Sequence, residues 1–250
     1  MACVEEMRAR LVDMKALLIP LKNSANSKTR LAGLLSAEER AQLAWAMFED
    51  VSRAVCTTTA PDRVVLVSSF EPALEHARSH DWEVLIEESQ LSESASVDWA
   101  SRVLAERGFN TVMRLPADIP LVEARDIDEL FSIELRRPAA VLVPSREGTG
   151  TNAIIRTPPD LFPSRFGSNS LALHSEEAAR AGIECMIVNN TRIALDIDEP
   201  SDIRFLLEAS KETATSHALA EMRVADRLRG LAAVREKDHG PPTEANPPRP

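Results

Sequence analysis

Two groups of aspartates stand where acidic side chains could bind a metal ion. Asp118 lies in the sequence LPADIPL, directly after a short apolar run, and Asp196 and Asp198 follow a second apolar run at 192–195. Such runs are typical of strands, and open α/β sheets bind ligands at the carboxyl ends of their strands. A single aspartate after a strand more often caps the next helix, but carboxylates at two strand ends favour a hard cation such as Mg²⁺. The sequence therefore predicts that Asp118, Asp196 and Asp198 hold metal.

These predicted carboxylates would repel one another in the absence of a cation. On this basis we expect Asp118→Asn to remove most turnover and to leave the thermal midpoint of unfolding unchanged or raised. A large fall in midpoint with unaltered activity would mean that Asp118 only caps a helix.

A polar loop with three cations follows the first apolar run. The run covers 15–22 and suits a central strand buried on both faces, and the loop adds Lys28 and Arg30 to Lys22 at its start. It contains no glycine, so neither the Walker phosphate loop nor the dinucleotide-binding fingerprint is present. Cations in a loop after the first strand suit a nucleoside triphosphate through charge-assisted hydrogen bonds. A solvated linker explains the loop equally well.

Two later loops are rich in glycine, serine and threonine, which favour the binding of anions. The sequence GTGTN at 148–152 combines threonine hydroxyls with glycines that let backbone N–H groups approach an anion, and a hairpin turn is the compatible alternative. Gly167 and Ser170 precede a predicted helix, whose first N–H groups are free. His174 lies one turn further on, where packing against the core or solvent explains it as well as a phosphate contact.

Composition places the chain among globular proteins with one core. Its 250 residues are 44% hydrophobic and 27% charged, which suits one sizeable domain with tails. The formal charge of −10 argues against nucleic acid or an anionic membrane as partner, since both bind basic surfaces. Cys3, Cys56 and Cys185 are too far apart for a disulfide framework or a zinc site, which fits a reducing cytoplasm. No apolar run reaches the roughly 20 residues of a membrane span, and the N-terminus has no signal-peptide core.

Short apolar runs alternate with helical patterns, which predicts an α/β fold with βαβ units and a largely parallel sheet. Ser36 and Glu39 form a capping box that opens a helix. Trp82 and Trp99 are expected as core or interface aromatics rather than as platforms for stacking a base. The expected strands are 15–22, 64–69, 83–87, 110–114, 139–144, 153–156, 186–188 and 192–195, and the expected helices are 36–55, 71–79, 94–107, 126–135, 171–181 and 200–209.

Together these features suit transfer between two phosphorylated molecules. A metal would bridge triphosphate oxygens, lysines would neutralise developing charge, and a separate loop would hold an anionic acceptor. An acceptor that attacks through its own phosphate oxygen is already an anion, so it needs neither a protein nucleophile nor a strong general base.

The motifs in combination resemble the phospholactate guanylyltransferases, the CofC/FbiD family of coenzyme F420 biosynthesis, over about residues 14–209. The resemblance implies a MobA-like nucleotidyltransferase fold of three αβα layers, with a mostly parallel mixed sheet of about seven strands. It also implies GTP and Mg²⁺. The residues that carry it are 20–22 with 27–31, 115–121, 148–152, Phe166 and Gly167 with Ser170 and His174, and Asp196 and Asp198 with Pro200 and Asp202.

The resemblance also implies a role for individual residues. Asp118, Asp196 and Asp198 would hold metal, and Asp118 and Lys28 would be catalytic. The three-carbon acid would be bound by Thr151, Gly167 and Ser170, and the nucleotide by Lys22, Lys28, Arg30, Ser94 and Pro116. One motif departs from the family, because some members carry Leu-Asn-x-Ala where residues 91–95 read LSESA. Ser94 is the residue there that could still donate to the base.

The implied reaction transfers GMP from GTP to the phosphate of 2-phospho-L-lactate, phosphoenolpyruvate or 3-phosphoglycerate, with release of pyrophosphate. A nucleotidyltransferase for another phosphorylated acceptor and a non-catalytic nucleotide-binding module are the alternatives. A homodimer and hand-over of product to a downstream transferase of the pathway are compatible with the resemblance. Around the domain at 14–209 we expect an N-terminal extension at 1–13, an accessory helix at 210–236 and a disordered proline-rich tail at 237–250.

Overall fold

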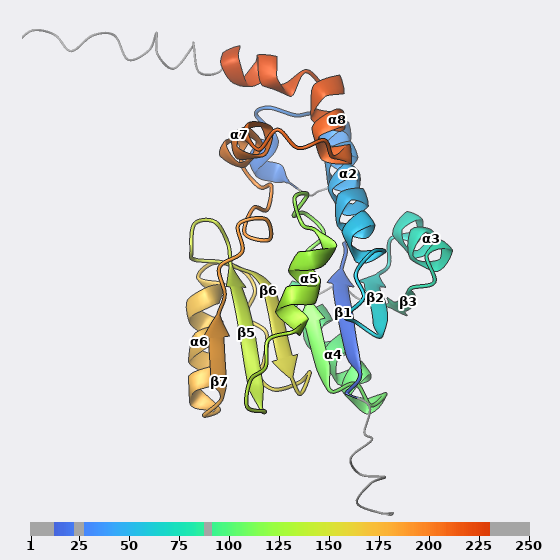
Figure 1. The fold of residues 1–250 in the computed structure, drawn as a ribbon. Helices are drawn as coiled ribbons and strands as arrows, with labels where there is room; N and C mark the ends of the chain where they lie inside the picture. Colours follow the sequence, from blue (N-terminus) through green and yellow to red (C-terminus); the bar gives the residue numbers. More distant parts are fainter. Residues whose placement is uncertain (1–12, 23–27, 88–91, 231–250) are drawn as a thin grey trace, which may run out of the picture.

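A seven-stranded mixed sheet organises the protein (Figure 1). The computed structural model describes residues 13–22, 28–87 and 92–230. The strand order is β3-β2-β1-β4-β6-β5-β7, and only β6 runs antiparallel to its neighbours. The strands are β1 Lys15–Pro20, β2 Arg63–Ser68, β3 Glu83–Ile86, β4 Thr111–Arg114, β5 Ala139–Pro144, β6 Thr151–Thr157 and β7 Glu184–Ile187. The predicted mostly parallel sheet is confirmed.

Helices cover both faces of the sheet, which confirms the three αβα layers. The helices α2, α3 and α5 share one core cluster on one face, while α4 and α6 pack on the other. Their bounds are α2 Ala37–Val55, α3 Glu71–Ser79, α4 Glu93–Glu106, α5 Ala124–Phe131, α6 Ser170–Arg180, α7 Pro200–Glu208 and α8 Ala214–Glu221, with a short 3₁₀ turn η2 at Thr29–Leu31. No helix in these described segments is long and apolar enough to cross a membrane.

The apolar run of β1 explains its central place. Leu17 and Ile19 pack towards α2 and α5, whereas Ala16 and Leu18 pack towards α4. A strand with apolar side chains on both faces is stable only between two helical layers. At the start of α2 the predicted capping box is present, since Ser36 Oγ accepts from the N–H of Glu39 and the Glu39 carboxylate accepts from the N–H of Ser36.

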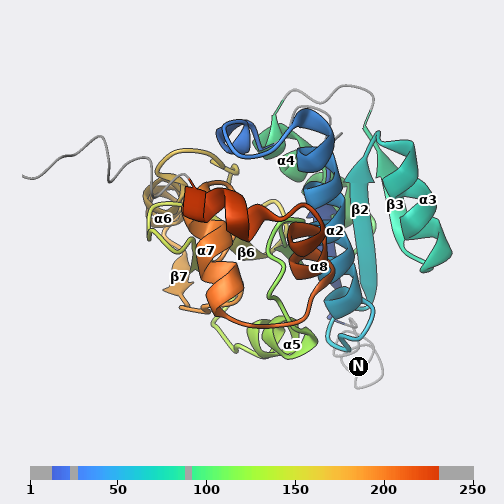
Figure 2. The ribbon, with the colours of Figure 1, turned by 90° about the horizontal axis from the view of Figure 1, so that it is seen from above.

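The helices α7 and α8 close the molecule beyond the carboxyl ends of the parallel strands (Figures 1 and 2). They share a separate apolar cluster with the first half of α2. Buried Asp50 on α2 anchors the start of α8. Its carboxylate accepts hydrogen bonds from the N–H groups of Ala214 and Thr215 and from the Thr215 hydroxyl. Leu219 and Leu228, which lie in the accessory helix expected at 210–236, therefore pack on the body of the protein.

The single helix expected at 210–236 is interrupted in the structure. After α8 the chain turns at 222–223, where Arg223 has a φ of 52°, and a second helical segment covers 224–230. A residue in this left-handed conformation cannot be part of a continuous right-handed helix, so the helix is broken at Arg223. The rest of the expected helix, the tail at 237–250 and nearly all of the extension at 1–13 lie outside the described residues.

The expected strand at 192–195 was wrong. The segment is a turn in which the Asn190 side-chain oxygen accepts from the N–H groups of Arg192 and Ile193. An asparagine that bonds to the backbone two residues on is a common alternative to a strand ladder. The aspartates that follow therefore lie in a loop before α7, and only Asp118 follows a strand.

Candidate active site

Two cavities lie next to each other at the carboxyl edge of the sheet. The first, of about 300 Å³, contains Lys22 and Lys28 and is called the lysine cavity. The second, of about 510 Å³, is lined by the β5–β6 connection and is called the hairpin cavity. The residues that line both are Glu93, Arg114, Pro116, Asp118 and Asp198. The site thus has room for two ligands that meet at one wall.

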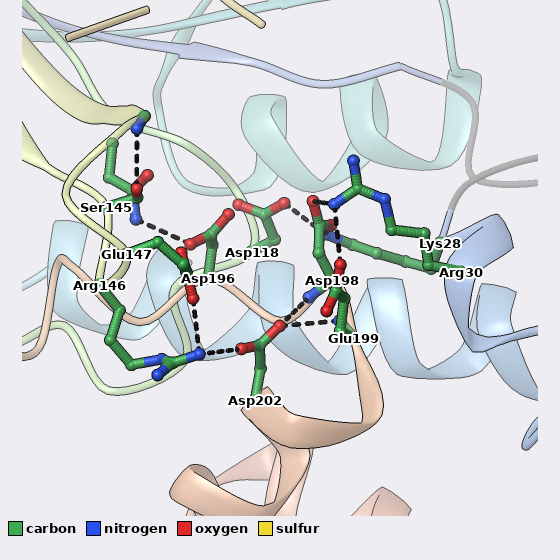
Figure 3. Close-up of polar contacts among 12 residues, drawn as sticks. Lys28, Arg30, Asp118, Ser145, Arg146, Glu147, Asp196, Asp198, Glu199 and Asp202 are labelled. Atoms are coloured by element: carbon green, nitrogen blue, oxygen red, sulfur yellow. Dashed lines mark hydrogen bonds and ion pairs between the residues drawn. The ribbon is translucent and has the colours of Figure 1, made fainter. Parts of the chain in front are cut away.

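Lys28 neutralises part of this wall. Its ammonium donates to Asp118 Oδ2 at 2.5 Å and to Asp198 Oδ1 at 2.7 Å (Figure 3). Burial on its own would lower the pKa of Lys28, but the charges of the two aspartates raise it above the usual value for lysine. Likewise burial would raise the pKa of Asp118, but the charge and hydrogen bond of Lys28 hold it below its usual value.

This pairing corrects the expectation that repulsion between carboxylates dominates at Asp118. Repulsion remains visible at Asp196, where burial and then the charge of Asp118 raise the pKa to about 6. Asp196 is held in place by Asn152, whose side-chain amide donates to Asp196 Oδ1 at 3.0 Å and to the carbonyls of Ile193 and Ala194. Sequence reasoning placed Asp196 by a strand that does not exist, and it missed the role of this asparagine.

The three aspartates suit a hard cation by their chemistry. They converge from two loops (Figure 3), and carboxylate oxygens are the ligands that Mg²⁺ prefers. In the described part of the chain, however, no group of three His, Cys, Asp or Glu side chains is arranged closely enough to bind a metal ion. Lys28 explains this, because its ammonium holds the place of a cation between Asp118 and Asp198. The residues therefore fit Mg²⁺ if Lys28 withdraws.

Thr151 and Ser170 line the hairpin cavity, and among the described residues their hydroxyl groups act as hydrogen-bond acceptors. Ser170 Oγ accepts from the N–H of Thr151 at 2.8 Å, and Thr151 Oγ1 lies 3.0 Å from His174 Nδ1. His174 Nε2 accepts from the N–H of Arg165, so Nδ1 carries the proton and donates to Thr151. Both hydroxyls are thus engaged as acceptors and keep their protons available for donation, so anion binding by these two loops stays a prediction.

His174 itself lines neither cavity. It is fully buried, and burial together with the charges of Arg156 and Arg114 lowers its pKa to about 4. Of the two interpretations left open by the sequence, packing in the core is the one that the structure supports. His174 positions Thr151.

The buried histidine predicts a specific loss of stability in acid. The pKa of His174 in the folded state is lower than its value of about 6.5 in the unfolded chain. The contribution of the neutral histidine to the stability of the fold is therefore complete above pH 6.5 and is lost as the pH falls towards 4. Between pH 7.5 and 5 the loss should be about 2 kcal/mol. We expect the free energy of unfolding, measured in urea, to fall between these two pH values by about 2 kcal/mol more in the wild type than in His174→Gln. Other groups titrate in both proteins, so an equal fall in the two would contradict the assignment.

Glycines shape both loops of the hairpin cavity. Gly167 has a φ of 120°, which L-residues rarely adopt, so the turn before α6 requires it. At Gly150 a Cβ atom would lie 2.9 Å from Ser145 Oγ, which accepts from the N–H of Gly150. A side chain at either position would change the loop that presents Thr151 and Ser170.

Of the residues expected to bind nucleotide, the structure gathers only some in the lysine cavity. Lys22, Lys28 and Pro116 line it. Arg30 lines the hairpin cavity instead, where it pairs with Glu199 at 3.3 Å and is 67% exposed. Ser94 lines neither cavity, and its hydroxyl accepts from the N–H of Phe166. The base contact expected of Ser94 is thus at odds with its position, because it supports the loop before Gly167. The segments 23–27 and 88–91 lie outside the described residues.

Two charged residues of the shared wall escaped the sequence analysis. Arg114 falls within the strand expected at 110–114, and Glu93 directly precedes the helix expected at 94–107. Yet a single arginine that ends a buried strand four residues before Asp118 is itself a signal, because arginine is almost never buried without a partner. Its position at the carboxyl edge points it at the site.

Comparison with solved structures defines the fold as that of the nucleotidyltransferases. A putative nucleotide-diphospho-sugar transferase from Desulfovibrio desulfuricans superposes with a TM-score of 0.72 and 16% identity, over 86% of this chain and 97% of that one. A nucleotidyl transferase from Methanothermobacter gives a TM-score of 0.58 and 14% identity, over 79% and 97%. At such low identity the likeness concerns the fold alone.

Sequence comparison identifies the family. The family model described as guanylyl transferase CofC like matches residues 14–235. A phosphoenolpyruvate guanylyltransferase from Conexibacter woesei is 33% identical over 80% of this chain and 91% of its own, and a 2-phospho-L-lactate guanylyltransferase from Methanothermobacter thermautotrophicus is 31% identical over 82% and 90%. A 3-phospho-D-glycerate guanylyltransferase from Colwellia psychrerythraea is 31% identical over 76% and 90%. The chain belongs to the CofC-like guanylyl transferase family, which confirms the resemblance and makes it a nucleotidyltransferase.

Proposed function

We propose that this enzyme transfers GMP from GTP to the phosphate of a three-carbon phosphoacid and releases pyrophosphate. The observation that carries the proposal is the pair of cavities that share the wall of Asp118 and Asp198. Two phosphorylated substrates that react with each other need adjacent compartments with the reacting groups at their border. The names of the relatives support GTP and an acceptor of this class.

The lysine cavity is assigned to GTP and the hairpin cavity to the acceptor. A phosphate oxygen of the acceptor attacks the α-phosphorus of GTP, forming one P–O bond. The bond between the α-phosphorus and the bridging oxygen breaks, and its electron pair leaves with pyrophosphate. Lys22 and Lys28 neutralise the triphosphate in the lysine cavity, while Thr151 and Ser170 donate hydrogen bonds to the acceptor. Mg²⁺ held by the three aspartates would add positive charge where the phosphates meet.

Pyrophosphate release with a panel of acceptors tests the proposal. The panel contains 2-phospho-L-lactate, phosphoenolpyruvate and 3-phosphoglycerate, each with GTP and with ATP and with or without Mg²⁺. We expect turnover with GTP, Mg²⁺ and at least one of the three acids. Turnover only with a different phosphorylated acceptor would establish the nearest alternative, and binding of GTP without turnover would favour a non-catalytic module.

The hydroxyl donors provide a second test within the same assay. Ser170→Ala and Thr151→Val should each raise the KM of the acceptor roughly 5- to 150-fold, corresponding to about 1 to 3 kcal/mol for one bond to a charged group. The KM of GTP should change little. Ser52→Ala, a buried serine of α2 that lines neither cavity, is the matched control. If the GTP KM rose instead, the two loops would belong to the nucleotide.

Several finer expectations belong to this proposal. A role in coenzyme F420 biosynthesis is expected from the family resemblance, and a cytoplasmic location from the wide spacing of the cysteines. A homodimer and hand-over of product to a downstream transferase are also retained as predictions. Size-exclusion chromatography with light scattering would test the dimer.

A further inference from the structure

The hairpin cavity has an unusual balance of charge for a compartment that takes an anion. The acidic residues that line it are Glu93, Asp118, Glu147, Asp196, Asp198, Glu199 and Asp202. Among its described lining residues the cations are Arg30 and Arg114. A three-carbon phosphoacid carries a carboxylate besides its phosphate, and bringing it among so many carboxylates requires a well-placed cation. Arg30 is largely exposed and already pairs with Glu199, which leaves Arg114.

Arg114 is held rigidly between the two loops of this cavity. It is the last residue of β4 and is buried, with 7% of its surface exposed. One terminal nitrogen, Nη1, donates to the carbonyl oxygen of Asn152 at 2.7 Å, and the guanidinium stacks over the Phe166 ring with 4.4 Å from Cζ to the centroid. The guanidinium therefore contacts a residue next to Thr151 and another next to Gly167.

On the remaining edge of the Arg114 guanidinium, only one of the two nitrogens has a hydrogen-bond partner among the described residues. Its second terminal nitrogen, Nη2, donates to the carboxylate of Glu93, whereas Nε has no hydrogen-bond partner within the described part of the chain. Nε and Nη2 lie on the same edge of a guanidinium, and this edge matches the two oxygens of a carboxylate. A buried N–H without a partner is costly, so its presence at a ligand cavity points to a partner that arrives from outside.

The side chain of Glu93 can be replaced on Arg114 by the carboxylate of a ligand. Glu93 is the first residue of α4 and lines both cavities, and its side chain is 37% exposed and contacts Arg114. A glutamate side chain offers the same chemical group as the carboxylate of the acceptor. Because it contacts only one of the two nitrogens on that edge, an acceptor carboxylate that contacts both would form one more hydrogen bond.

We propose that Arg114 is the specificity residue for the carboxylate of the acceptor, and that Glu93 occupies this position until the acceptor displaces it. The inference rests on the proposed function and adds to it the group that selects acids over other phosphate esters. The acceptor carboxylate contacts Nε and Nη2 of Arg114, and the exposed Glu93 side chain turns out to solvent. The phosphate of the acceptor then faces the wall of Asp118.

Two substitutions separate the roles of the pair. Arg114→Lys keeps the charge but loses the planar edge, so we expect the KM of the acceptor to rise about 10- to 100-fold with the KM of GTP within about twofold. Glu93→Gln weakens the competing group while leaving Arg114 in place, so the acceptor KM should fall severalfold. An acceptor KM that is unchanged in Arg114→Lys, or unchanged or raised in Glu93→Gln, would overturn the inference.

Arg156 provides the matched control for burial. It is a fully buried arginine on the adjacent strand β6, held by Asp98, Ser101 and the Phe162 carbonyl, and it lines neither cavity. Arg156→Lys should lower the thermal midpoint and leave both KM values near those of the wild type. If both arginine variants raised the acceptor KM alike, the effect of Arg114 would be structural and the inference would fail.

An acceptor whose carboxylate is replaced by a carboxamide identifies the group that Arg114 binds. In the wild type this change should raise KM about 10- to 100-fold, and in Arg114→Lys it should have a much smaller effect, since the carboxylate contact is already weakened. Equal effects in both proteins would show that the carboxylate binds elsewhere. If the wild type turned over no three-carbon phosphoacid at all, the proposed function itself would be wrong, an outcome distinct from every failure above.

Discussion

Asp118→Asn should reduce turnover by at least about 10²-fold, the loss seen when one preorganised electrostatic group is removed from a reaction centre. Asp118 stands on the wall between the two cavities, where the α-phosphate of GTP and the acceptor phosphate would meet. It also holds Lys28 in place. An uncharged asparagine would keep the size of the side chain but lose the negative charge, and with it the ion pair with the Lys28 ammonium.

The structure reverses the expected effect of this substitution on stability. Because Lys28 lowers the pKa of Asp118, the charged carboxylate stabilises the fold, and its loss should lower the free energy of unfolding by about 1 to 3 kcal/mol. Urea unfolding in the absence of Mg²⁺ measures this change. The effect should be partial, since Asp198 still accepts from Lys28.

Asp128→Asn is the matched control for this experiment. Asp128 accepts from Thr58, Thr59 and Ala60 and lines neither of the two cavities. Its replacement should lower the free energy of unfolding and leave kcat unchanged. Asp118 would be reduced to a structural aspartate if its replacement also lowered stability without affecting kcat.

The sequence predicted those parts of the fold that depend on residues close together along the chain. The apolar run of β1 predicts burial on both faces, and the Ser36–Glu39 capping box predicts the start of α2, since each depends on neighbours within a few residues. The run at 192–195 has the same local pattern as a strand. There a local interaction competes with the strand, because the Asn190 side chain accepts from the N–H groups of Arg192 and Ile193. A tertiary one adds to it, because Asn152 donates to the carbonyls of Ile193 and Ala194 from another element.

The candidate site was predictable in its residue types and less so in its contacts. The aspartates, Lys28, Thr151 and Ser170 all lie at the two cavities, as their motifs indicated. The roles of Arg114 and His174 depend on partners far away in sequence, namely Asn152 and Thr151. No spacing rule along the chain contains those contacts, so only the folded structure could reveal them.

Lys28→Gln should have the other large effect, because it removes the positive charge shared by Asp118 and Asp198. We expect turnover to fall by at least about 10²-fold, since the same ammonium is assigned to the triphosphate. Without Mg²⁺ the free energy of unfolding should also fall by about 1 to 3 kcal/mol. The loss lies below that of a fully buried pair because both aspartates are partly exposed.

Mg²⁺ should distinguish this variant from an ordinary destabilised one. In the wild type a divalent cation competes with the Lys28 ammonium for Asp118 and Asp198, whereas in Lys28→Gln the two carboxylates are free to bind it. We expect at least about tenfold tighter binding of Mg²⁺ in the absence of GTP, equivalent to about 1.4 kcal/mol, and a larger rise of the thermal midpoint on adding Mg²⁺. Arg53→Gln, which removes an exposed cation that pairs with Asp50 and lines neither cavity, should leave the Mg²⁺ shift near that of the wild type. An equal Mg²⁺ shift in wild type and Lys28→Gln would mean that the lysine and the metal do not share the aspartates.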